Sequence, residues 1–189
     1  MPALNTIIFV CWAVFWIYWM VWAFRSKKNI RSRLGGFMRA RLVMFVVLVI
    51  LVHLHFRQAY SFNFQRTVSS NKAVLTIGFI IFLLGLALAI WARVYLGKNW
   101  GMPMAEKQEP ELVTSGPYRF IRHPIYTGIL LAILGSALAI SLYWLVILAF
   151  SGTYFIYSAT VEERNMMNQF PKTYPGYKQQ TKMLIPFVL

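Results

Sequence analysis

The sequence of 189 residues contains no aspartate, five glutamates and a single cysteine, Cys11. One cysteine allows no internal disulfide and no cysteine-based metal site. His53 and His55 lie two residues apart and His123 is distant from both in the chain, so we expect no transition-metal site, which needs more histidine or cysteine ligands. The absence of aspartate also removes the usual partner of histidine in a serine hydrolase triad, although glutamate could substitute.

Charged residues are scarce and apolar residues abundant. Only 13% of the chain is charged, whereas 59% is hydrophobic and 17% aromatic. A soluble domain has about a quarter charged residues and about half apolar ones, so the composition predicts an integral-membrane protein. The net charge of +14 resides in basic residues between the apolar runs. Topology and anionic membrane lipid explain that pattern, and we expect no nucleic-acid partner.

Five apolar runs predict an all-α membrane protein with about five transmembrane helices, at 4–24, 42–55, 73–94, 125–140 and 142–159. The first and third are long enough to cross about 30 Å of hydrocarbon, whereas the second is short and must borrow flanking residues. No basic residue precedes the first run, which favours a retained span over a signal peptide. Only Ser141 separates the last two runs, so they are predicted to form a C-terminal hairpin, with small residues such as Gly128 and Gly135 letting its two arms approach closely.

The distribution of basic residues predicts the orientation. Seven of them lie within 25–41, which places that gap in the cytoplasm by the positive-inside rule. The amino terminus is then outside, and the segments 92–124 and 161–189, which hold every glutamate, are cytoplasmic together with the carboxyl terminus. We expect one integral-membrane domain over 1–189, with a two-helix part at 1–72 and a core at 73–189.

Glu162 and Glu163 continue the fifth apolar run directly. Neighbouring side chains on a helix point about 100° apart, so the two carboxylates cannot face one partner. We expect one to hold a cation while the other orients it, the alternative being a plain interfacial pair. If the helix continues through Met167, the pair is interior and no helix-dipole effect applies.

The stretch "SGPYRFIRHPIYTG" at 115–128 gathers polar chemistry before the fourth run. Pro124 suits the first turn of a helix, and a residue before proline, here His123, avoids the helical conformation. The unpaired amides of that turn, with Arg122 nearby, suit a carboxylate or phosphate, while Tyr118 and Tyr126 offer π-faces to a cation. A ligand with both charges fits, although lipid phosphate and an interfacial aromatic belt are the alternatives.

Four motifs carry a family resemblance. They are "LGKNW" at 96–100, "ELVTSGPYRFIRHPIYTG" at 111–128, "EE" at 162–163, and the spacing of Phe170, Tyr174 and Tyr177 followed by "IPF" at 185–187. Over roughly residues 90–189 the chain resembles the integral-membrane methyltransferases typified by isoprenylcysteine carboxyl methyltransferase, with phospholipid methyltransferases as relatives.

The resemblance implies that S-adenosylmethionine is the cofactor, held in the cytosol between the segment before the fourth span and the glutamate pair. Glu162 and Glu163 are the predicted catalytic residues, because either could take the proton of an amine acceptor. The predicted cofactor-binding residues, with Arg122 included for its charge, are Glu111, Leu112, Val113, Tyr118, Arg122, His123, Pro124, Ile125, Tyr126 and Glu162.

The expected acceptor is a small lipophilic molecule: a prenylcysteine-like carboxylate, a lipid amine or a thiol. Relatives that methylate prenylcysteine carry an arginine one turn before the glutamate pair, where this chain has Ser158. A carboxylate acceptor would then need another cation, with Arg93 and Arg164 as the nearest candidates. Two alternatives stay open: a membrane reductase of the steroid-reductase type with a nicotinamide cofactor, and a non-catalytic lipid-binding membrane protein.

Overall fold

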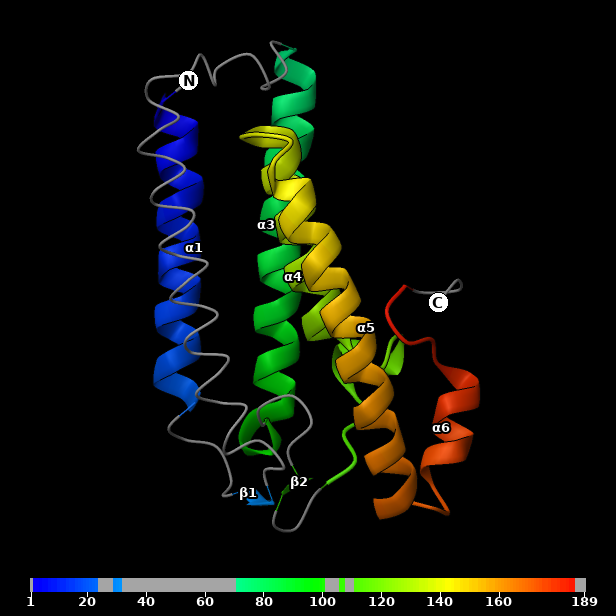
Figure 1. Ribbon diagram of the computed structural model, residues 1–189. Coiled ribbons are helices and arrows are strands. Elements are labelled where there is room, and N and C mark those ends of the chain that lie inside the picture. The colour runs from blue at the N-terminus through cyan, green and yellow to red at the C-terminus, as the bar shows by residue number, and fades with distance from the viewer. Residues whose placement is uncertain (1, 24–28, 32–70, 101–105, 108–110, 186–189) are drawn as a thin grey trace.

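The computed structural model describes residues 2–23, 29–31, 71–100, 106–107 and 111–185, which are almost entirely helical (Figure 1). The helices are α1 (Pro2–Ala23), α3 (Lys72–Leu96), α4 (Pro124–Ala139), α5 (Trp144–Gln169) and α6 (Tyr174–Gln180), with short 3-10 turns η2 (Gly97–Asn99) and η3 (Gly116–Arg119). The one departure from the all-α prediction is an antiparallel pairing of β1 (Asn29–Arg31) with β2 (Glu106–Lys107). The predicted span at 42–55 lies outside the described residues.

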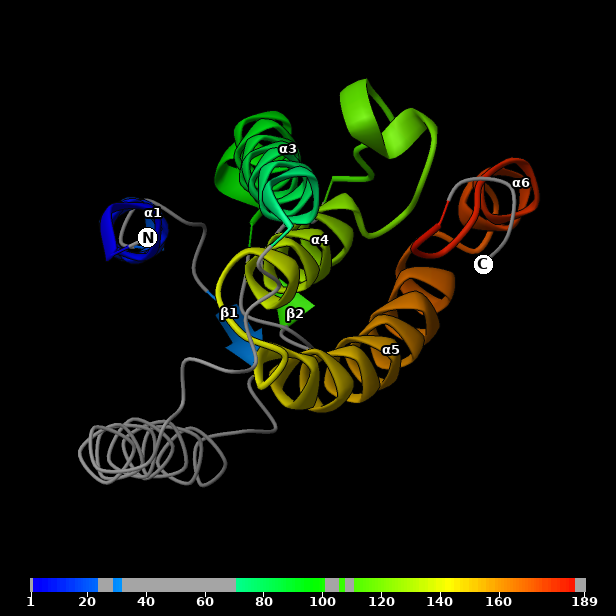
Figure 2. The same ribbon diagram turned by 90° about the horizontal axis from the view of Figure 1, so that it is seen from above.

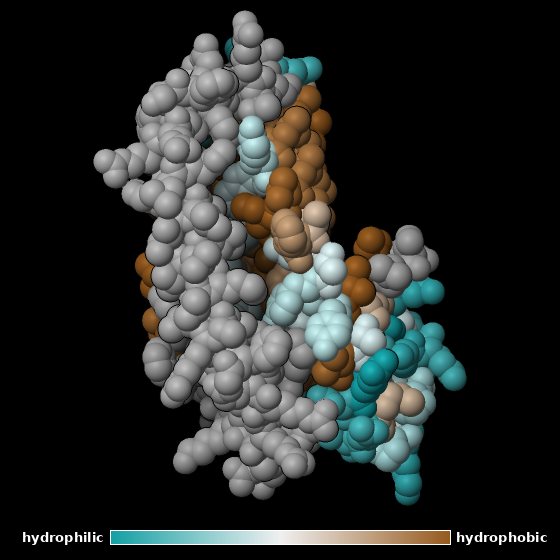
Figure 3. Space-filling model, viewed as in Figure 1, coloured by the Kyte–Doolittle hydropathy of each residue, from teal (hydrophilic) through white to brown (hydrophobic). Residues whose placement is uncertain are grey.

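Four of the predicted spans are helices in the structure. By length and composition α3 and α5, of 25 and 26 residues, could each cross a membrane, while the apolar helices over Ala3–Trp19 and Pro124–Ala139 are shorter. Large hydrophobic side chains are exposed along the outer faces of α1, α3 and α5, including Val14, Leu84 and Phe150. Figure 3 shows hydrophobic surface over the upper part of the bundle and hydrophilic surface at the lower right, around α6. Apolar surface of this extent is costly in water, and it suits the lipid environment that the composition predicts.

Glycines on α3 and α4 bring these two helices into backbone contact. A Cβ atom at Gly85 would lie 2.4 Å from the amide nitrogen of Ala132, and one at Gly135 would lie 2.3 Å from that of Phe82. Only the absence of a side chain permits this approach. The prediction that Gly128 and Gly135 bring together the arms of the α4–α5 hairpin is therefore wrong, because Gly128 likewise faces α3, against Ala89.

Helix α1 contacts the neighbouring helices at two places along its length. Toward its middle, Trp12 Nε1 donates to Ser136 Oγ on α4 over 3.1 Å, and the Trp12 ring stacks on Trp144 of α5 with centroids 6.0 Å apart. Near its carboxyl end, the Trp22 carbonyl accepts from Arg93 Nη2 at 3.1 Å. Hydrogen bonds to helix-end carbonyls satisfy groups that lack partners within the helix, so these contacts join α1 to α3 and α4.

Helices α4 and α5 form the predicted hairpin, with the turn at 140–143. Seen along the bundle in Figure 2, α4 lies between α3 and α5, and α6 lies beyond the end of α5. Helix α5 runs ten residues past the predicted span, to Gln169 rather than Ala159. Glu162 and Glu163 therefore lie in the interior of the helix and not at its carboxyl end. As expected for that case, no helix-dipole effect applies to them.

Candidate active site

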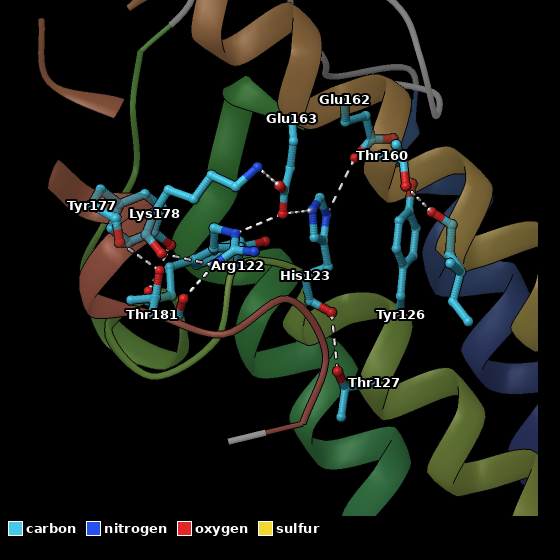
Figure 4. Close-up of polar contacts among 12 residues, drawn as sticks. Arg122, His123, Tyr126, Thr127, Thr160, Glu162, Glu163, Tyr177, Lys178 and Thr181 are labelled. Atoms are coloured by element: carbon cyan, nitrogen blue, oxygen red, sulfur yellow. Dashed lines mark hydrogen bonds and ion pairs between the residues drawn. The ribbon is translucent and has the colours of Figure 1, made fainter. Parts of the chain in front are cut away.

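The segment before α4 is shaped by glycine and proline. Gly116 has a φ of 61°, and a Cβ atom there would lie 2.5 Å from the ring of Tyr95, so both its conformation and its surroundings require glycine. Pro124 opens α4, and His123 before it has φ −124° and ψ 59°, outside the helical region as a residue preceding proline should be. This geometry sets His123 at the start of α4, beside the glutamates of α5 (Figure 4).

Glu162 is the more accessible of the two carboxylates, with its side chain 27% exposed. Its Oε1 accepts a hydrogen bond from Tyr126 Oη at 2.5 Å, and its Oε2 lies 3.5 Å from His123 Nδ1. The predicted cofactor-binding residues His123, Tyr126 and Glu162 are therefore in mutual contact, across the interface of α4 and α5. Tyr126 and His123 therefore fix the direction of the Glu162 carboxylate, which remains partly exposed.

Glu163 is buried and surrounded by cations. Its side chain is 4% exposed, and its Oε1 accepts from Arg122 Nε at 2.6 Å while its Oε2 lies 2.7 Å from Lys178 Nζ. The same Oε1 is 3.6 Å from His123 Nε2. A buried carboxylate is tolerated only when paired and hydrogen-bonded. Here Arg122 and His123 from the segment before α4, and Lys178 from α6, supply the compensation.

His123 lies between the two carboxylates, with its side chain 10% exposed. The expectation that the two carboxylates cannot face one partner is therefore wrong, because the imidazole ring approaches Glu162 with Nδ1 and Glu163 with Nε2. Burial alone would lower the pKa of this imidazole, but the facing carboxylates of Glu162 and Glu163 outweigh it and raise the pKa. The Nε2 atom is buried and has no hydrogen-bond partner, since Glu163 Oε1 lies beyond hydrogen-bond length. The raised pKa favours the protonated imidazole beside both glutamates, and within the described residues Nε2 has no partner at hydrogen-bond length.

Tyr126 is enclosed by two aromatic rings. His123 lies parallel to it with an interplanar angle of 4° and centroids 5.5 Å apart, and Phe155 of α5 stacks on it at 9° and 4.5 Å. A π-face offered to a cation must be uncovered. In this arrangement Tyr126 presents its hydroxyl group, and Phe155, which the sequence analysis did not single out, is its neighbour.

Arg122 is engaged by the protein itself. Besides Glu163, its guanidinium Nη1 donates to the carbonyls of Lys178, at 3.2 Å, and of Thr181. Its backbone amide donates to Lys182 O at 2.8 Å, and that of His123 donates to Met183 O at 3.0 Å. The two amides just before α4 therefore bind the chain's own carboxyl-terminal segment.

Most of the remaining predicted residues are buried or partly buried in the segment that leads into and opens α4. Tyr118, Pro124 and Ile125 are buried, and the Tyr118 carbonyl accepts from Tyr177 Oη at 2.7 Å. Burial raises the pKa of Tyr177 to about 12, so its hydroxyl stays protonated and able to donate. Leu112 and Val113 are partly buried.

Glu111 belongs to a different contact. It is exposed, and its Oε2 accepts from Asn99 Nδ2 at 2.9 Å. This bond ties the "LGKNW" motif to the start of the segment that leads into the site.

Arg93 and Arg164 were the two arginines considered as partners of a carboxylate acceptor. Arg93 is 2% exposed, donates through Nη1 to Gly97 O at 2.7 Å, and lies over the Trp100 ring at 4.6 Å. Arg164 is exposed on α5. Ser158, one turn before Glu162, is fully buried, and within the described part of the chain its Oγ has no hydrogen-bond partner.

Sequence reasoning missed the carboxyl-terminal half of the cluster. Lys178 and Thr181 both contact Arg122 or Glu163 (Figure 4), and Thr127 Oγ1 donates to Leu184 O at 2.6 Å. The tail spacing of Tyr174 and Tyr177 marked the region without indicating these contacts. A charge count could have pointed to Lys178, because two adjacent buried or half-buried carboxylates need more than one cation.

Parts of the chain are similar in sequence to two proteins of known name. The chain is 34% identical over 82 residues to methanethiol S-methyltransferase 1 of Bradyrhizobium diazoefficiens, covering 43% of this chain and 28% of the relative. It is 32% identical over 123 residues to the cobalt-zinc-cadmium resistance protein CzcN of Cupriavidus metallidurans, covering 61% of this chain and 50% of the relative. The matches therefore span half or less of these relatives.

The fold is similar to that of the eukaryotic intramembrane Ras methyltransferase ICMT, isoprenylcysteine carboxyl methyltransferase. The TM-score is 0.54 at 22% identity, over 84% of this chain and 55% of that one. The family model for phospholipid methyltransferase matches residues 73–173, more than half of the chain and including α3, α4, α5 and the glutamate pair. The chain belongs to the phospholipid methyltransferase family of membrane proteins.

Proposed function

We propose that this protein transfers a methyl group from S-adenosylmethionine to a small lipophilic acceptor that partitions into the membrane. The observation that carries the proposal is the convergence of His123, Tyr126 and Glu162, with Tyr126 and His123 both directed at the same carboxylate. Family membership supports this function over the nicotinamide-dependent reductase and the non-catalytic lipid-binding protein.

The residues present suit the cofactor. S-adenosylmethionine carries a carboxylate, an ammonium and a sulfonium group, and when bound it supplies the methyl group on that positively charged sulfur. Glu162 is a partly exposed anion suited to a positive group, and His123 Nε2 is a buried donor without a hydrogen-bond partner. Apolar Ile125 and Val113 suit the uncharged parts of the molecule.

Three of the predicted roles change in this proposal. Glu162 is the residue that faces the ligand, whereas Glu163 and Arg122 neutralise one another and hold the site together. Arg122 is then not the carrier of the cofactor carboxylate, because Nε and Nη1 already bind protein groups. Tyr126 directs Glu162 through its hydroxyl.

The charges around the site favour an acceptor that loses a proton, such as a thiol or an amine. Arg122 and Lys178 are paired with Glu163, and Arg93 donates to the carbonyls of Gly97 and Trp22. These three already bind protein groups, and Arg164, exposed on α5, is the candidate that remains for a carboxylate. Glu162 could take the proton released when a thiol or amine is methylated. Catalysis then rests on alignment of the reactants at a site with little water.

The orientation in the membrane is part of the proposal. With the amino terminus outside, the glutamate pair and the carboxyl terminus face the cytoplasm, where the cofactor is available. A reporter fused after Leu189 should then give a cytoplasmic signal, and an external signal would reverse the topology.

The experiment that tests the function is transfer of labelled methyl from S-adenosylmethionine into a total lipid extract, with the purified protein in detergent and the product identified. Calorimetry with S-adenosylhomocysteine and with NADPH accompanies it. Binding of the first is expected. Binding of NADPH alone, with no methyl transfer, would contradict the proposal.

A further inference from the structure

Residues 174–185, which comprise α6 and the five residues after it, are called the carboxyl-terminal strap. Most of its hydrogen bonds are to residues 118–127, which are called the cofactor segment. Carbonyl oxygens of the strap accept from the amides of Arg122 and His123 and from Thr127 Oγ1. Tyr177 Oη donates to the Tyr118 carbonyl. Every one of these contacts lies on residues 118–127, so the strap and the cofactor segment share one interface.

The groups behind the strap are closed to solvent. The side chains of Arg122, His123 and Glu163 are 8%, 10% and 4% exposed, and Tyr118 and Tyr126 are likewise buried. Glu162 is accessible from outside, with its side chain 27% exposed, whereas the buried His123 Nε2 can meet a ligand atom only when a covering segment moves. Closing segments that exclude water in this way are common in enzymes.

Lys178 differs from the other strap contacts in both chemistry and exposure. Its ammonium group lies 2.7 Å from Glu163 Oε2 on α5, and its side chain is 46% exposed. The neighbouring pair of Arg122 with Glu163 is buried at both ends. An ion pair at a wet rim competes with water and opens more readily than a buried one.

We propose that Lys178 is a positioning residue whose ion pair with Glu163 latches the strap over the cofactor site and so controls entry and exit of the cofactor. This inference rests on the proposed function. When the pair opens, α6 loses its charged link to α5, while Arg122 still compensates Glu163. The site therefore keeps its charge balance during opening.

Binding kinetics of S-adenosylhomocysteine to the full-length protein in lipid nanodiscs test the latch. Lys178→Met is expected to raise both the association and the dissociation rate constants, the latter by about fivefold, because the gate is more often open and a partly exposed ion pair contributes up to about 1 kcal/mol. Lys178→Arg preserves the ion pair and should restore both rates. Lys172→Met, which removes an exposed lysine just before α6, serves as the matched control and should leave both rates unchanged.

Damage to the site would give a different pattern from loss of a latch. If Lys178→Met slowed association, or left both rate constants within about twofold of those of the unmodified protein, the latch would be refuted. Hydrogen exchange of peptides covering 174–185 gives a readout that needs no ligand: faster exchange is expected in Lys178→Met than in Lys172→Met. If the unmodified protein bound no S-adenosylhomocysteine, the proposed function would fail, and this exchange comparison would still decide whether Lys178 holds the strap.

Discussion

Arg122 Nε lies 2.6 Å from Glu163 Oε1, joining two residues that are 41 positions apart in the chain. The pair connects the segment before α4 to the carboxyl-terminal part of α5, and Lys178 adds α6 to the same carboxylate. His123 faces both glutamates and so connects Glu162 to the same cluster. The adjacent acids thus differ in their surroundings, with Glu163 directed into the protein and Glu162 partly exposed, toward the ligand site that we propose.

This division predicts opposite results for the two glutamates. Glu163→Gln leaves Arg122 and Lys178 without their counterion, so we expect a loss of about 3–5 kcal/mol in the free energy of unfolding. Glu162→Gln should change the thermal midpoint little and weaken S-adenosylhomocysteine binding at least about tenfold, a difference of about 1.4 kcal/mol. Thermal unfolding and calorimetry on the same samples check both.

The same calorimetry extends to two alanine variants. His123→Ala and Glu162→Ala should each abolish cofactor binding, because each removes one side of the contact between α4 and α5. Glu106→Ala, in β2, is the control and should bind normally. Equal affinity of all three variants would refute the placement of the site.

A further prediction concerns the contact between α3 and α4. Gly135→Ala places a Cβ atom 2.3 Å from the Phe82 nitrogen, which forces the helices apart and should cost about 1–3 kcal/mol or more. Gly152→Ala on α5 is the matched control, because its nearest neighbour would be 4.0 Å away. There alanine should stabilise the helix by up to about 1 kcal/mol. Similar thermal midpoints for the two variants would contradict the packing.

The elements of this fold are predictable because hydropathy and proline act locally. An apolar run of sufficient length predicts a helix such as α3, and Pro124 predicts where α4 begins. Helix partners are harder to predict. Helix α4 is apolar on every side, so its sequence does not indicate that Gly128 and Gly135 face α3 and not α5.

The site was predictable in its first half only. The cluster of Arg122, His123 and Tyr126 follows from a single stretch of sequence, and its pairing with the glutamates follows from the family resemblance. The contacts of Lys178 and Thr181 with that cluster join residues up to 59 positions apart. Such contacts depend on how the chain returns after α5, and no local pattern encodes that path.

The raised pKa of His123 predicts a pH-dependent stability. The groups that face the imidazole are Glu162 and Glu163 from α5 and Tyr126 from α4, with Arg122 and Lys178 paired to Glu163. A histidine with a raised pKa in the folded state contributes stability that is present in full below its unfolded pKa of about 6.5. That contribution is lost as the pH rises through the folded value.

The thermal midpoint of the unmodified protein should accordingly exceed that of His123→Asn by more at about pH 6 than at about pH 9. Calorimetric or fluorescence-monitored unfolding measures the difference, in a detergent whose charge does not change between these two pH values. A gap between the two proteins that stayed constant or widened with pH would show that His123 is not held charged by the glutamates.

Two buried serines provide the last prediction, because they differ in one respect. Ser136 and Ser158 are both fully buried. Ser136 Oγ accepts from Trp12 Nε1 and donates to Ala132 O, whereas Ser158 Oγ has no hydrogen-bond partner among the residues that the structure describes. Other helical hydroxyls, such as those of Thr153 and Thr160, bond back to the carbonyl four residues earlier.

Removing a satisfied hydroxyl and removing an unsatisfied one should shift stability in opposite directions. Ser136→Ala leaves the Trp12 indole nitrogen without an acceptor and should cost about 1–3 kcal/mol. Ser158→Ala removes a polar atom that is buried at a cost, so the thermal midpoint should rise by about 2–4 °C for a chain of this size. If Ser158→Ala instead destabilised the protein as much as Ser136→Ala does, the Ser158 hydroxyl would have a hydrogen-bond partner in the folded state. An ordered water molecule near Glu162 would be the first candidate for that partner.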